Sequence, residues 1–344
     1  MARRIGKQTI AFDKQISVLS TASVVGPMEG EGPLGKYFDV VLTDDECGED
    51  SYEKAETCML TKAYDIALRK AKMSKNELDL FIGGDLLNQI IATTFAVEQY
   101  DVPYWGVYNA CSTFSLAIQI ASTAIEAGGM RKVMASASSH FSSAERQYRT
   151  PLELGCQNPI TAQRTTTAAG CCILGESGQG PYVTQITTGR IIDFDVKDPF
   201  NMGTAMAPAA ADTILAHFKD TGTSFEDYDL VVTGDLASMG LEITENILKL
   251  EGYHPKNNFT DCGKMIFDPE NQKVDLGGSG AGCSASVFAA VLYEKLKSRK
   301  LNNVLLVPTG ALLSPTSSLQ KQSIPCIAHA VALSNHSNKK GANA

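Results

Sequence analysis

One segment of this chain occurs twice, and the duplication constrains the fold more than any other feature. Residues 74–87 (SKNELDLFIGGDLL) return without a gap as residues 224–237 (SFEDYDLVVTGDLA), with six of fourteen positions identical. A second similarity follows each copy, because residues 110–112 and 282–284 both place a Cys-Ser pair in front of an apolar run. A repeat at about half the chain length predicts two related halves around one core, whereas a solenoid repeats every few tens of residues.

Length and composition agree with two such halves, which we assign to residues 1–180 and 181–344. The chain has 344 residues, of which 44% are hydrophobic and 20% are charged, as in ordinary globular proteins. Its net charge of −8, without a cluster of Lys and Arg, argues against nucleic acid as a partner. Nine cysteines without paired spacing favour a reducing compartment over a disulfide framework. Neither a signal peptide nor an apolar run of membrane-spanning length is visible, so we expect a cytosol-side protein that contacts membranes only through partners.

Helical and extended patterns alternate along the first half. A helix is predicted from Ser51 to about Met73, and another over residues 88–99. Short apolar runs at residues 80–83 and 105–108 predict strands. This alternation predicts a mostly parallel sheet with helices on both faces. Trp105, the only tryptophan, lies in the second of these strands, and we expect it to pack in the core rather than to stack on the adenine of a coenzyme.

Two helices, one after each Cys-Ser pair, are predicted to be apolar on every side. They cover residues 112–125 and 284–292. A helix that is apolar all round is buried all round. Placed between two sheets, these helices would produce five layers in the order helix, sheet, helix, sheet, helix. This α/β architecture is that of the thiolase fold.

Several segments carry a resemblance to known families. Residues 109–114 (NACSTF), between a predicted strand and the first buried helix, resemble the nucleophile turn of thiolases and type III ketoacyl-ACP synthases. The chain as a whole, including residues 136–151 (SASSHFSSAERQYRTP) and 308–330, resembles the stage V sporulation AD family of endospore-forming bacteria.

This resemblance implies a thiolase-fold protein of the forespore that binds dipicolinic acid. It also implies that the protein is encoded with membrane proteins that move dipicolinic acid and calcium into the spore, and that it meets the inner spore membrane through them. Thiolase-fold relatives commonly dimerise across the strand before the cysteine, here residues 105–108, so a homodimer is expected by analogy.

The synthase chemistry itself is predicted to be incomplete. Cys111 would lie at a helix N-terminus, where the helix dipole and free N–H groups favour a thiolate. Type III synthases add a His and an Asn from loops of the second half. The corresponding segments here, residues 233–237 (TGDLA) and 277–282 (GGSGAG), contain neither. Each missing partner should cost at least ~10²-fold in rate. The sequence therefore favours a pocket that binds a ligand without a complete catalytic set.

A dipicolinate pocket needs apolar walls for a planar ring and donors or positive charge for two carboxylates. The helix start at Ser112 offers donors, and residues 138–149 add hydroxyls, an imidazole and two guanidiniums, whose planar forks suit carboxylates. In the alternative interpretation Arg146 and Arg149 are surface charges, and Asp235 forms a turn or helix cap instead of orienting a donor or meeting calcium. Calcium arriving with the ligand would reduce the need for basic residues. The predicted ligand-binding residues are Cys111, Ser112, Ser139, His140, Arg146, Arg149 and Asp235.

We expect no cofactor and no intrinsic metal site. No two of the five histidines have metal-ligand spacing, and the acidic residues 44–50 lack the glycine and closing glutamate of an EF-hand. A second hypothesis is a residual ketoacyl-synthase-like acyltransferase, in which Cys111 is the nucleophile and His140 is the base.

Overall fold

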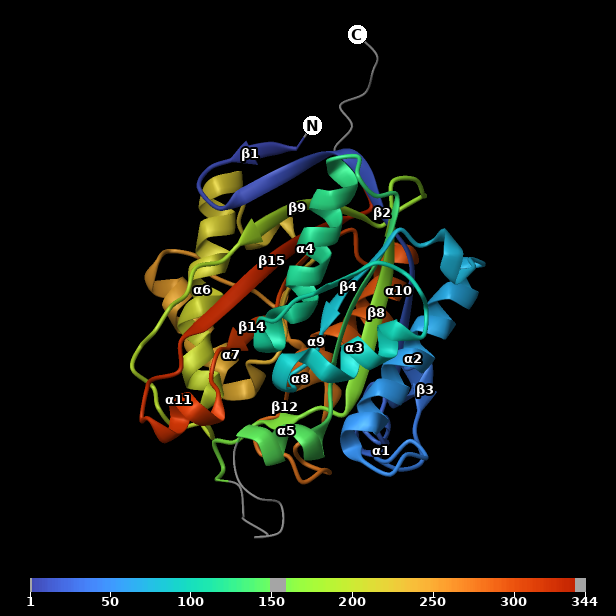
Figure 1. Ribbon diagram of the computed structural model, residues 1–344. Coiled ribbons are helices and arrows are strands. Elements are labelled where there is room, and N and C mark those ends of the chain that lie inside the picture. Colours follow the sequence, from blue (N-terminus) through green and yellow to red (C-terminus); the bar gives the residue numbers. More distant parts are fainter. Residues whose placement is uncertain (1, 149–158, 338–344) are drawn as a thin grey trace.

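Most strands of both halves form one continuous sheet in the computed structural model, which describes residues 2–148 and 159–337, whereas β7 and β12 pair with each other in a separate two-stranded sheet (Figure 1). The strand order is β11-β10-β13-β15-β9-β2-β8-β6-β4-β5. In the first half the strands are β1 (Arg3–Ile5), β2 (Thr9–Val25), β3 (Val40–Val41), β4 (Leu80–Gly84), β5 (Tyr104–Gly106), β6 (Lys132–Ser139), β7 (Arg164–Thr165) and β8 (Ala168–Gly175). In the second half they are β9 (Tyr182–Thr188), β10 (Leu230–Thr233), β11 (Phe259–Asp261), β12 (Gly278–Ser279), β13 (Asn303–Val307), β14 (Thr309–Ala311) and β15 (Cys326–Ser334).

The long strand β2 joins the two halves. Its N-terminal part pairs with β9 and its C-terminal part pairs with β8, both antiparallel. Antiparallel pairing also links β6 to β8 and β13 to β15, while the outer pairs β4–β5, β4–β6, β10–β11 and β10–β13 are parallel. The prediction of a mostly parallel sheet is therefore wrong, because the last strand of each half returns antiparallel beside its neighbour.

Helices cover both faces of each half and also separate the halves. They are α1 (Pro27–Gly30), α2 (Tyr52–Ala71), α3 (Ile91–Glu98), α4 (Thr113–Glu126), α5 (Phe141–Tyr148), α6 (Met202–Thr221), α7 (Ala237–Leu250), α8 (Cys262–Ile266), α9 (Ala281–Val287), α10 (Tyr293–Lys297) and α11 (Pro315–Leu319). Helices α2 and α3 pack on the first-half strands, and α6 and α7 pack on the second-half strands. Helices α4 and α9 occupy the layer between them, which confirms the thiolase-like α/β fold (Figure 1).

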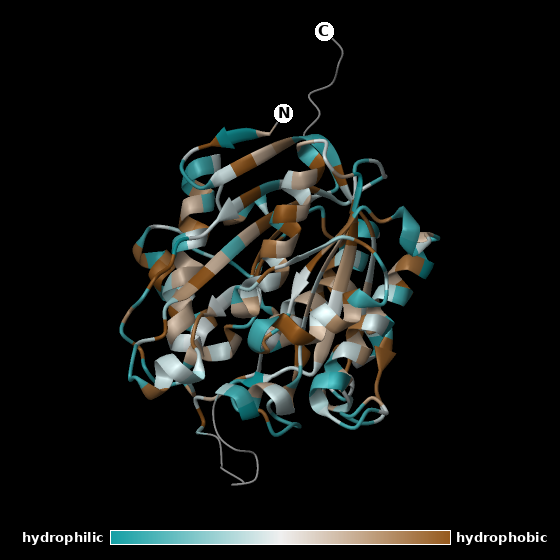
Figure 2. Cartoon of the chain, in the orientation of Figure 1, coloured by the Kyte–Doolittle hydropathy of each residue, from teal (hydrophilic) through white to brown (hydrophobic). Residues whose placement is uncertain are grey.

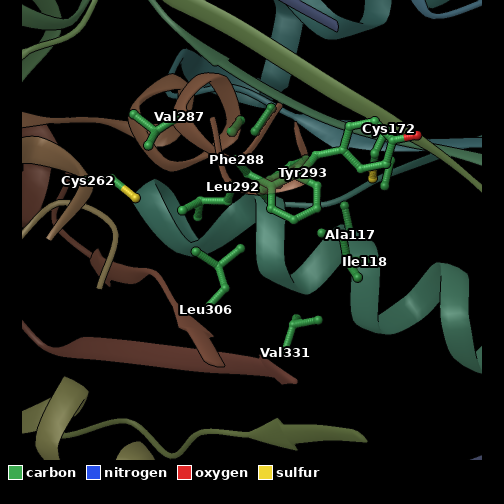
Figure 3. Close-up of a cluster of buried hydrophobic side chains, with 14 of the residues drawn as sticks. Ala117, Ile118, Cys172, Cys262, Val287, Phe288, Leu292, Tyr293, Leu306 and Val331 are labelled. Atoms are coloured by element: carbon green, nitrogen blue, oxygen red, sulfur yellow. The ribbon is translucent and has the colours of Figure 1, made fainter. Parts of the chain in front are cut away.

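The two central helices are buried as predicted. Phe114 of α4 and Phe288, which follows α9, have ring centroids 5.5 Å apart. In Figure 3 the side chains of Ala117 and Ile118 face those of Phe288 and Leu292 across this layer. Figure 2 shows apolar residues along the central strands and α4, and hydrophilic residues mainly on the outer helices and loops. Burial of both apolar helices accounts for their lack of a polar face.

Two local predictions fail for identifiable reasons. Trp105 is 47% exposed, not packed in the core, because β5 is the last strand of the sheet and pairs with β4 alone among the described strands. The helix predicted to begin at residue 88 begins at Ile91, because Gln89 and Ile90 have positive φ angles of 56° and 50°. Such left-handed backbone interrupts a right-handed helix. The proposed boundary at residue 180 falls between β8 and β9 and stays a prediction.

Candidate functional site

Cys111 lies in a tight turn, Ala110–Ser112, between β5 and α4. Ala110 has a positive φ of 47°, and the carbonyl oxygen of Asn109 accepts hydrogen bonds from the backbone N–H of Ser112 at 3.0 Å and from its hydroxyl at 2.8 Å. Strand β14 approaches so closely that a Cβ on Gly310 would lie 2.0 Å from the Asn109 oxygen. The turn is therefore held in a single, strained conformation at the start of α4.

Two loops from the second half meet this turn. The hydroxyl oxygen of Ser279 lies 3.8 Å from the sulfur of Cys111. The carboxyl group of Asp235 is also close enough to the thiol to raise its pKa. These loops are the two in which the type III synthases would be expected to carry their His and Asn. Asp235 and Ser279 therefore surround Cys111 where a base and an amide donor would be needed for condensation.

Asp235 is completely buried and only partly satisfied. Its Oδ1 accepts a hydrogen bond from the N–H of Thr309 at 3.0 Å, whereas Oδ2 has no hydrogen-bond partner within residues 2–148 and 159–337. Burial raises the pKa of Asp235 well above its ordinary value, and the nearby carboxyl of Asp261 raises it further. A protonated acid is the form that such an environment favours.

The thiol of Cys111 is also held in its protonated form. Burial raises its pKa well above the ordinary value, and the neighbouring carboxyl of Asp235 adds to the rise. Hydrogen bonds from Ser279 and from the N–H of Gly280 lower the pKa without offsetting these effects. The expectation that the helix N-terminus favours a thiolate is therefore corrected, because desolvation and a neighbouring acid outweigh the helix dipole.

Cys111 forms part of the wall of a cavity of about 30 Å³. The cavity is lined by Leu86, Tyr108, Ala110, Cys111, Ala144, Tyr148, Thr165, Pro199, Met202, Ser279, Gly280, Ala311 and Leu313. Since a water molecule needs roughly 10–15 Å³ of such space, the cavity as it stands has room for about two waters. Most of the lining side chains are apolar, so the site suits a ring better than an extended charged group.

Two tyrosines separate this cavity from a larger hollow outside. The outer hollow measures about 290 Å³ and shares Tyr108, Tyr148 and Leu313 with the inner cavity. The hydroxyl of Tyr148 donates to the carbonyl oxygen of Leu86 and lies 3.2 Å from the hydroxyl of Tyr108. These side chains must move before anything larger than a few waters can pass from the hollow to Cys111.

The predicted serines have structural roles. Ser112 donates to the carbonyl of Asn109, within its own turn. Ser139 is buried at the end of β6, donates to the carbonyl of Thr166 at 2.7 Å and accepts from the N–H of Gly282 at 3.1 Å. Neither serine is among the residues that line the cavity.

His140 does not face Cys111. Its Nε2 lies 2.8 Å from the carbonyl oxygen of Asp45, its Nδ1 accepts from the N–H of Ser142 at 3.2 Å, and its ring packs against Tyr52. Burial lowers the pKa of His140, which favours the neutral ring. With both ring nitrogens engaged elsewhere, His140 is not placed to act as a base for Cys111.

The predicted arginines contribute no described contact to the cavity. Arg146 is an exposed side chain that pairs with Glu53 at 3.1 Å, which agrees with its interpretation as a surface charge. Arg149 lies outside the described residues. The side chain of Arg164 points away from the cavity, whereas that of its neighbour Thr165 lines it. Its guanidinium stacks on Phe141, 3.7 Å from the ring centroid, because successive strand residues point to opposite faces.

Ser279 and the two tyrosines were not predicted as site residues from the sequence. Ser279 lies in the glycine-rich segment that corresponds to the asparagine loop of the type III synthases. The position of this segment therefore predicted a place near Cys111, but nothing about a serine predicted a role there. Tyr148 lies in a segment in which only serine, histidine and arginine side chains were predicted to bind a ligand, and Tyr108 lies in a segment that was predicted only as a strand. No three His, Cys, Asp or Glu residues within the described ranges are grouped so as to hold a metal ion. No helix of those ranges has both the length and the apolar character needed to cross a membrane.

Solved structures share this fold. The chain matches 3-oxoacyl-acyl-carrier-protein synthase III from Aquifex aeolicus with a TM-score of 0.57 and 16% identity, covering 93% of this chain and 99% of that one. It matches a single-residue variant of Xanthomonas campestris OleA bound with cerulenin with a TM-score of 0.59 and 14% identity, covering 94% and 97%. At these identities the likeness establishes the fold alone.

Sequence comparison identifies the family. Residues 6–334 match the family described as Stage V sporulation protein AD (SpoVAD). The chain is also 42% identical to stage V sporulation protein AD of Bacillus subtilis over 326 residues, which covers 95% of this chain and 96% of the relative. The chain therefore belongs to the stage V sporulation protein AD family, whose fold here is that of the type III ketoacyl synthases.

Proposed function

We propose that this sporulation protein binds dipicolinic acid, as its calcium chelate, in the cavity beside Cys111 and delivers it to membrane proteins for uptake into the spore. The observation that carries the proposal is the environment of the Cys111 thiol. Its pKa is raised by burial and by Asp235, and the described residues that line its cavity include no histidine. Such a site can hold a ligand non-covalently but lacks an activated nucleophile.

The charges around the cavity favour the chelate over the bare dianion. The described residues that line the cavity include no Lys, Arg or His, and the carboxyl of Asp235 lies behind Cys111. Two carboxylates entering such a site would be desolvated without compensation. One calcium ion neutralises the two negative charges of dipicolinate and binds its oxygens, so the chelate can enter the cavity without a basic side chain to offset its charge.

The shape of the site suggests how the ligand would enter. The cavity of about 30 Å³ is too small for an aromatic ring, whereas the adjoining hollow measures about 290 Å³. Rotation of Tyr148 and Tyr108 would join the two spaces and place phenol rings beside the ligand ring. Offset stacking of aromatic rings is favourable by ~1 kcal/mol beyond the area buried.

Equilibrium dialysis of the full chain tests this proposal. Three solutions are compared: dipicolinate with calcium, dipicolinate with a calcium chelator, and calcium alone. We expect saturable retention of dipicolinate when calcium is present, weaker retention without it, and no comparable retention of calcium alone. Lack of retention at millimolar chelate would reject the proposal, and equal retention with and without calcium would reject the role of the chelate.

The acyltransferase hypothesis predicts a different observation. Incubation with acyl-CoA substrates of several chain lengths, followed by mass spectrometry of the intact chain, would reveal an acyl adduct at Cys111. We expect none. An adduct at Cys111 that turns over would replace the binding proposal with a catalytic one.

A forespore location, contact with the inner spore membrane through partner proteins and a homodimeric state belong to the same proposal. The homodimer is supported by β5, a strand at one edge of the sheet, where Trp105 is 47% exposed, and by Tyr108, which follows β5 and is 40% exposed. An open edge with exposed aromatic side chains suits pairing with a second copy of the same strand.

A further inference from the structure

Cys47 and Cys58 form a pair of thiols in contact. Their sulfur atoms lie 2.8 Å apart, although the two residues come from different elements, the acidic loop before α2 and α2 itself. Both are partly exposed, whereas the other cysteines within the described ranges are buried. A disulfide has a sulfur separation of ~2.05 Å, so only a small further approach separates this pair from a covalent bond.

The loop is built so that Cys47 points at α2. Cys47 has a positive φ of 56°, which is uncommon for a residue with a side chain. Its backbone N–H donates to Oδ1 of Asp44 at 2.8 Å, and the N–H of Glu46 donates to the same oxygen at 3.1 Å. This turn holds the Cys47 thiol over the second turn of α2, where Cys58 lies.

The two thiols differ in their surroundings. Cys58 lines an open hollow of about 500 Å³ together with Lys54 and Lys62. The S–H of Cys47 donates to the sulfur of Cys58. Burial and the contact with Cys58 raise the pKa of Cys47, and the nearby thiols raise the pKa of Lys62, which keeps its ammonium charged. Because Cys58 lines the hollow and Cys47 does not, Cys58 is the thiol that a reagent in the hollow meets first.

We propose that Cys47 and Cys58 are a reversible dithiol–disulfide site that is oxidised by small-molecule disulfides entering the hollow beside Lys62. Cys58 gives up its proton and attacks one sulfur of the reagent, which releases one thiol and leaves a mixed disulfide on Cys58. Cys47 then gives up its proton, attacks the sulfur of Cys58 and expels the second thiol. The protein loses two protons and two electrons, and the reagent gains them as two free thiols.

The bond would fasten the acidic loop to α2. In the reduced protein the loop is held by the Asp44 turn and by the contact of the Asp45 carbonyl with His140. The new covalent link would close a short loop between positions 47 and 58. Closure of a loop lowers the entropy of the unfolded chain, so the free energy of unfolding should be higher for the oxidised protein than for the reduced one.

The test equilibrates the folded full chain with mixtures of reduced and oxidised glutathione, then alkylates the free thiols and maps them by peptide mass spectrometry. Measurements are repeated in a Cys156→Ser background, because Cys156 lies outside the described residues. We expect loss of alkylation at Cys47 and Cys58 together, and an intact mass lower by two hydrogens. Full alkylation of both thiols in a large excess of oxidised glutathione would overturn the proposal.

Two single variants separate the steps. Cys47→Ser should accumulate a glutathione adduct on Cys58, because the resolving thiol is missing. Cys58→Ser should leave Cys47 as a free thiol under the same conditions. A stable adduct on Cys58 in the unsubstituted chain would overturn the proposed pairing, as would an adduct that forms faster on Cys47 than on Cys58. Circular dichroism of each variant confirms that the chain is folded.

Discussion

Asp85 and Asp235 occupy the same position in the two repeats, but only Asp85 caps the helix that follows it. Asp85 accepts hydrogen bonds from the N–H of Leu87 at 2.9 Å and from the N–H and hydroxyl of Thr93 at 2.7 and 2.6 Å. In the second repeat the helix is capped by Asp261 instead, which accepts hydrogen bonds from the backbone N–H groups of Leu236 and Ala237 at the start of α7. The carboxyl of Asp235 is thereby left to face Cys111.

Replacing Asp235 by Asn should increase the reactivity of Cys111. The amide retains an acceptor for the Thr309 N–H but cannot ionise, so it cannot acquire the negative charge that would oppose a thiolate as the pH rises. We expect alkylation of Cys111 by iodoacetamide near pH 8 to accelerate by ~10-fold, the change that corresponds to one pKa unit. The rate is measured by mass spectrometry of the peptide that contains Cys111.

Asp85→Asn is the matched control. It alters the equivalent residue of the first repeat and should cost ~1 kcal/mol of unfolding free energy through a weakened helix cap. The alkylation rate of Cys111 should stay unchanged in this variant. Equal acceleration in both variants would mean that loosening of the fold, not the carboxyl group of Asp235, controls the reactivity of the thiol.

Filling the cavity should abolish binding of the chelate. Ala144, on α5, lines the cavity, and Ala144→Phe would occupy the space beside Cys111. We expect retention of the calcium chelate in dialysis to fall by at least ~10-fold, or ~1.4 kcal/mol, with a stability cost of ~1–3 kcal/mol for the larger side chain. Ala127→Phe, at the exposed C-terminal end of α4, is the control and should bind normally. Unimpaired binding by Ala144→Phe would place the ligand elsewhere.

Cys111→Ala should fold and bind. The substitution removes one small buried group, with an expected cost of ~1 kcal/mol in unfolding free energy. Because the proposed function needs no nucleophile, the variant should retain the chelate with nearly the affinity of the unsubstituted protein. Urea unfolding and dialysis measure the two quantities. An unfolded variant would show that Cys111 is a core residue and not part of a binding site.

Glu29 should make stability depend on pH. It is buried, its Oε1 accepts from the N–H of Thr167 at 2.9 Å, and burial raises its pKa from 4.5 to about 7. A carboxyl with a raised pKa binds its proton more tightly in the folded state, so its contribution to stability is complete below pH 4.5 and is lost as the pH rises through 7. This loss amounts to ~3 kcal/mol.

Glu29→Gln should therefore remove this part of the pH dependence. Glutamine resembles the protonated acid and keeps an acceptor for Thr167. The free energy of unfolding in urea, measured from about pH 4.5 to about pH 8, should fall less with rising pH in the variant than in the unsubstituted chain. Parallel curves for the two proteins would show that Glu29 titrates normally.

A charge on the edge strand should disrupt the expected homodimer. Trp105 lies on β5 at the end of the sheet and is 47% exposed. If β5 pairs with its copy, Trp105→Lys would place two like charges in a desolvated interface. Natural edge strands carry lysine for the same reason, because its charge prevents pairing with another strand. Analytical ultracentrifugation should report a monomer for this variant. Phe194 is 68% exposed and does not lie on β5, so Phe194→Lys should not change the oligomeric state. A monomeric unsubstituted chain would refute the expectation directly.

Much of the fold could be predicted because its signals are local. The periodicity after Ser51 predicted α2, and the all-round apolar pattern after Ser112 predicted the burial of α4. The turn at Cys111 was also recognisable from its own residues. The exposure of Trp105 was not, because whether a strand is central or at an edge depends on which other strands pair with it.

The sequence by itself determined that the chain has two related halves, two buried central helices and a cysteine at the start of one of them, because repeats and hydrophobic periodicity are properties of neighbouring residues. Only the tertiary structure decided what surrounds that cysteine. Asp235 and Ser279 are more than a hundred residues away along the chain and reach Cys111 because the two halves pack together around α4 and α9. Their burial together reverses the effect of the helix N-terminus on the thiol, since desolvation depends on the complete packed environment.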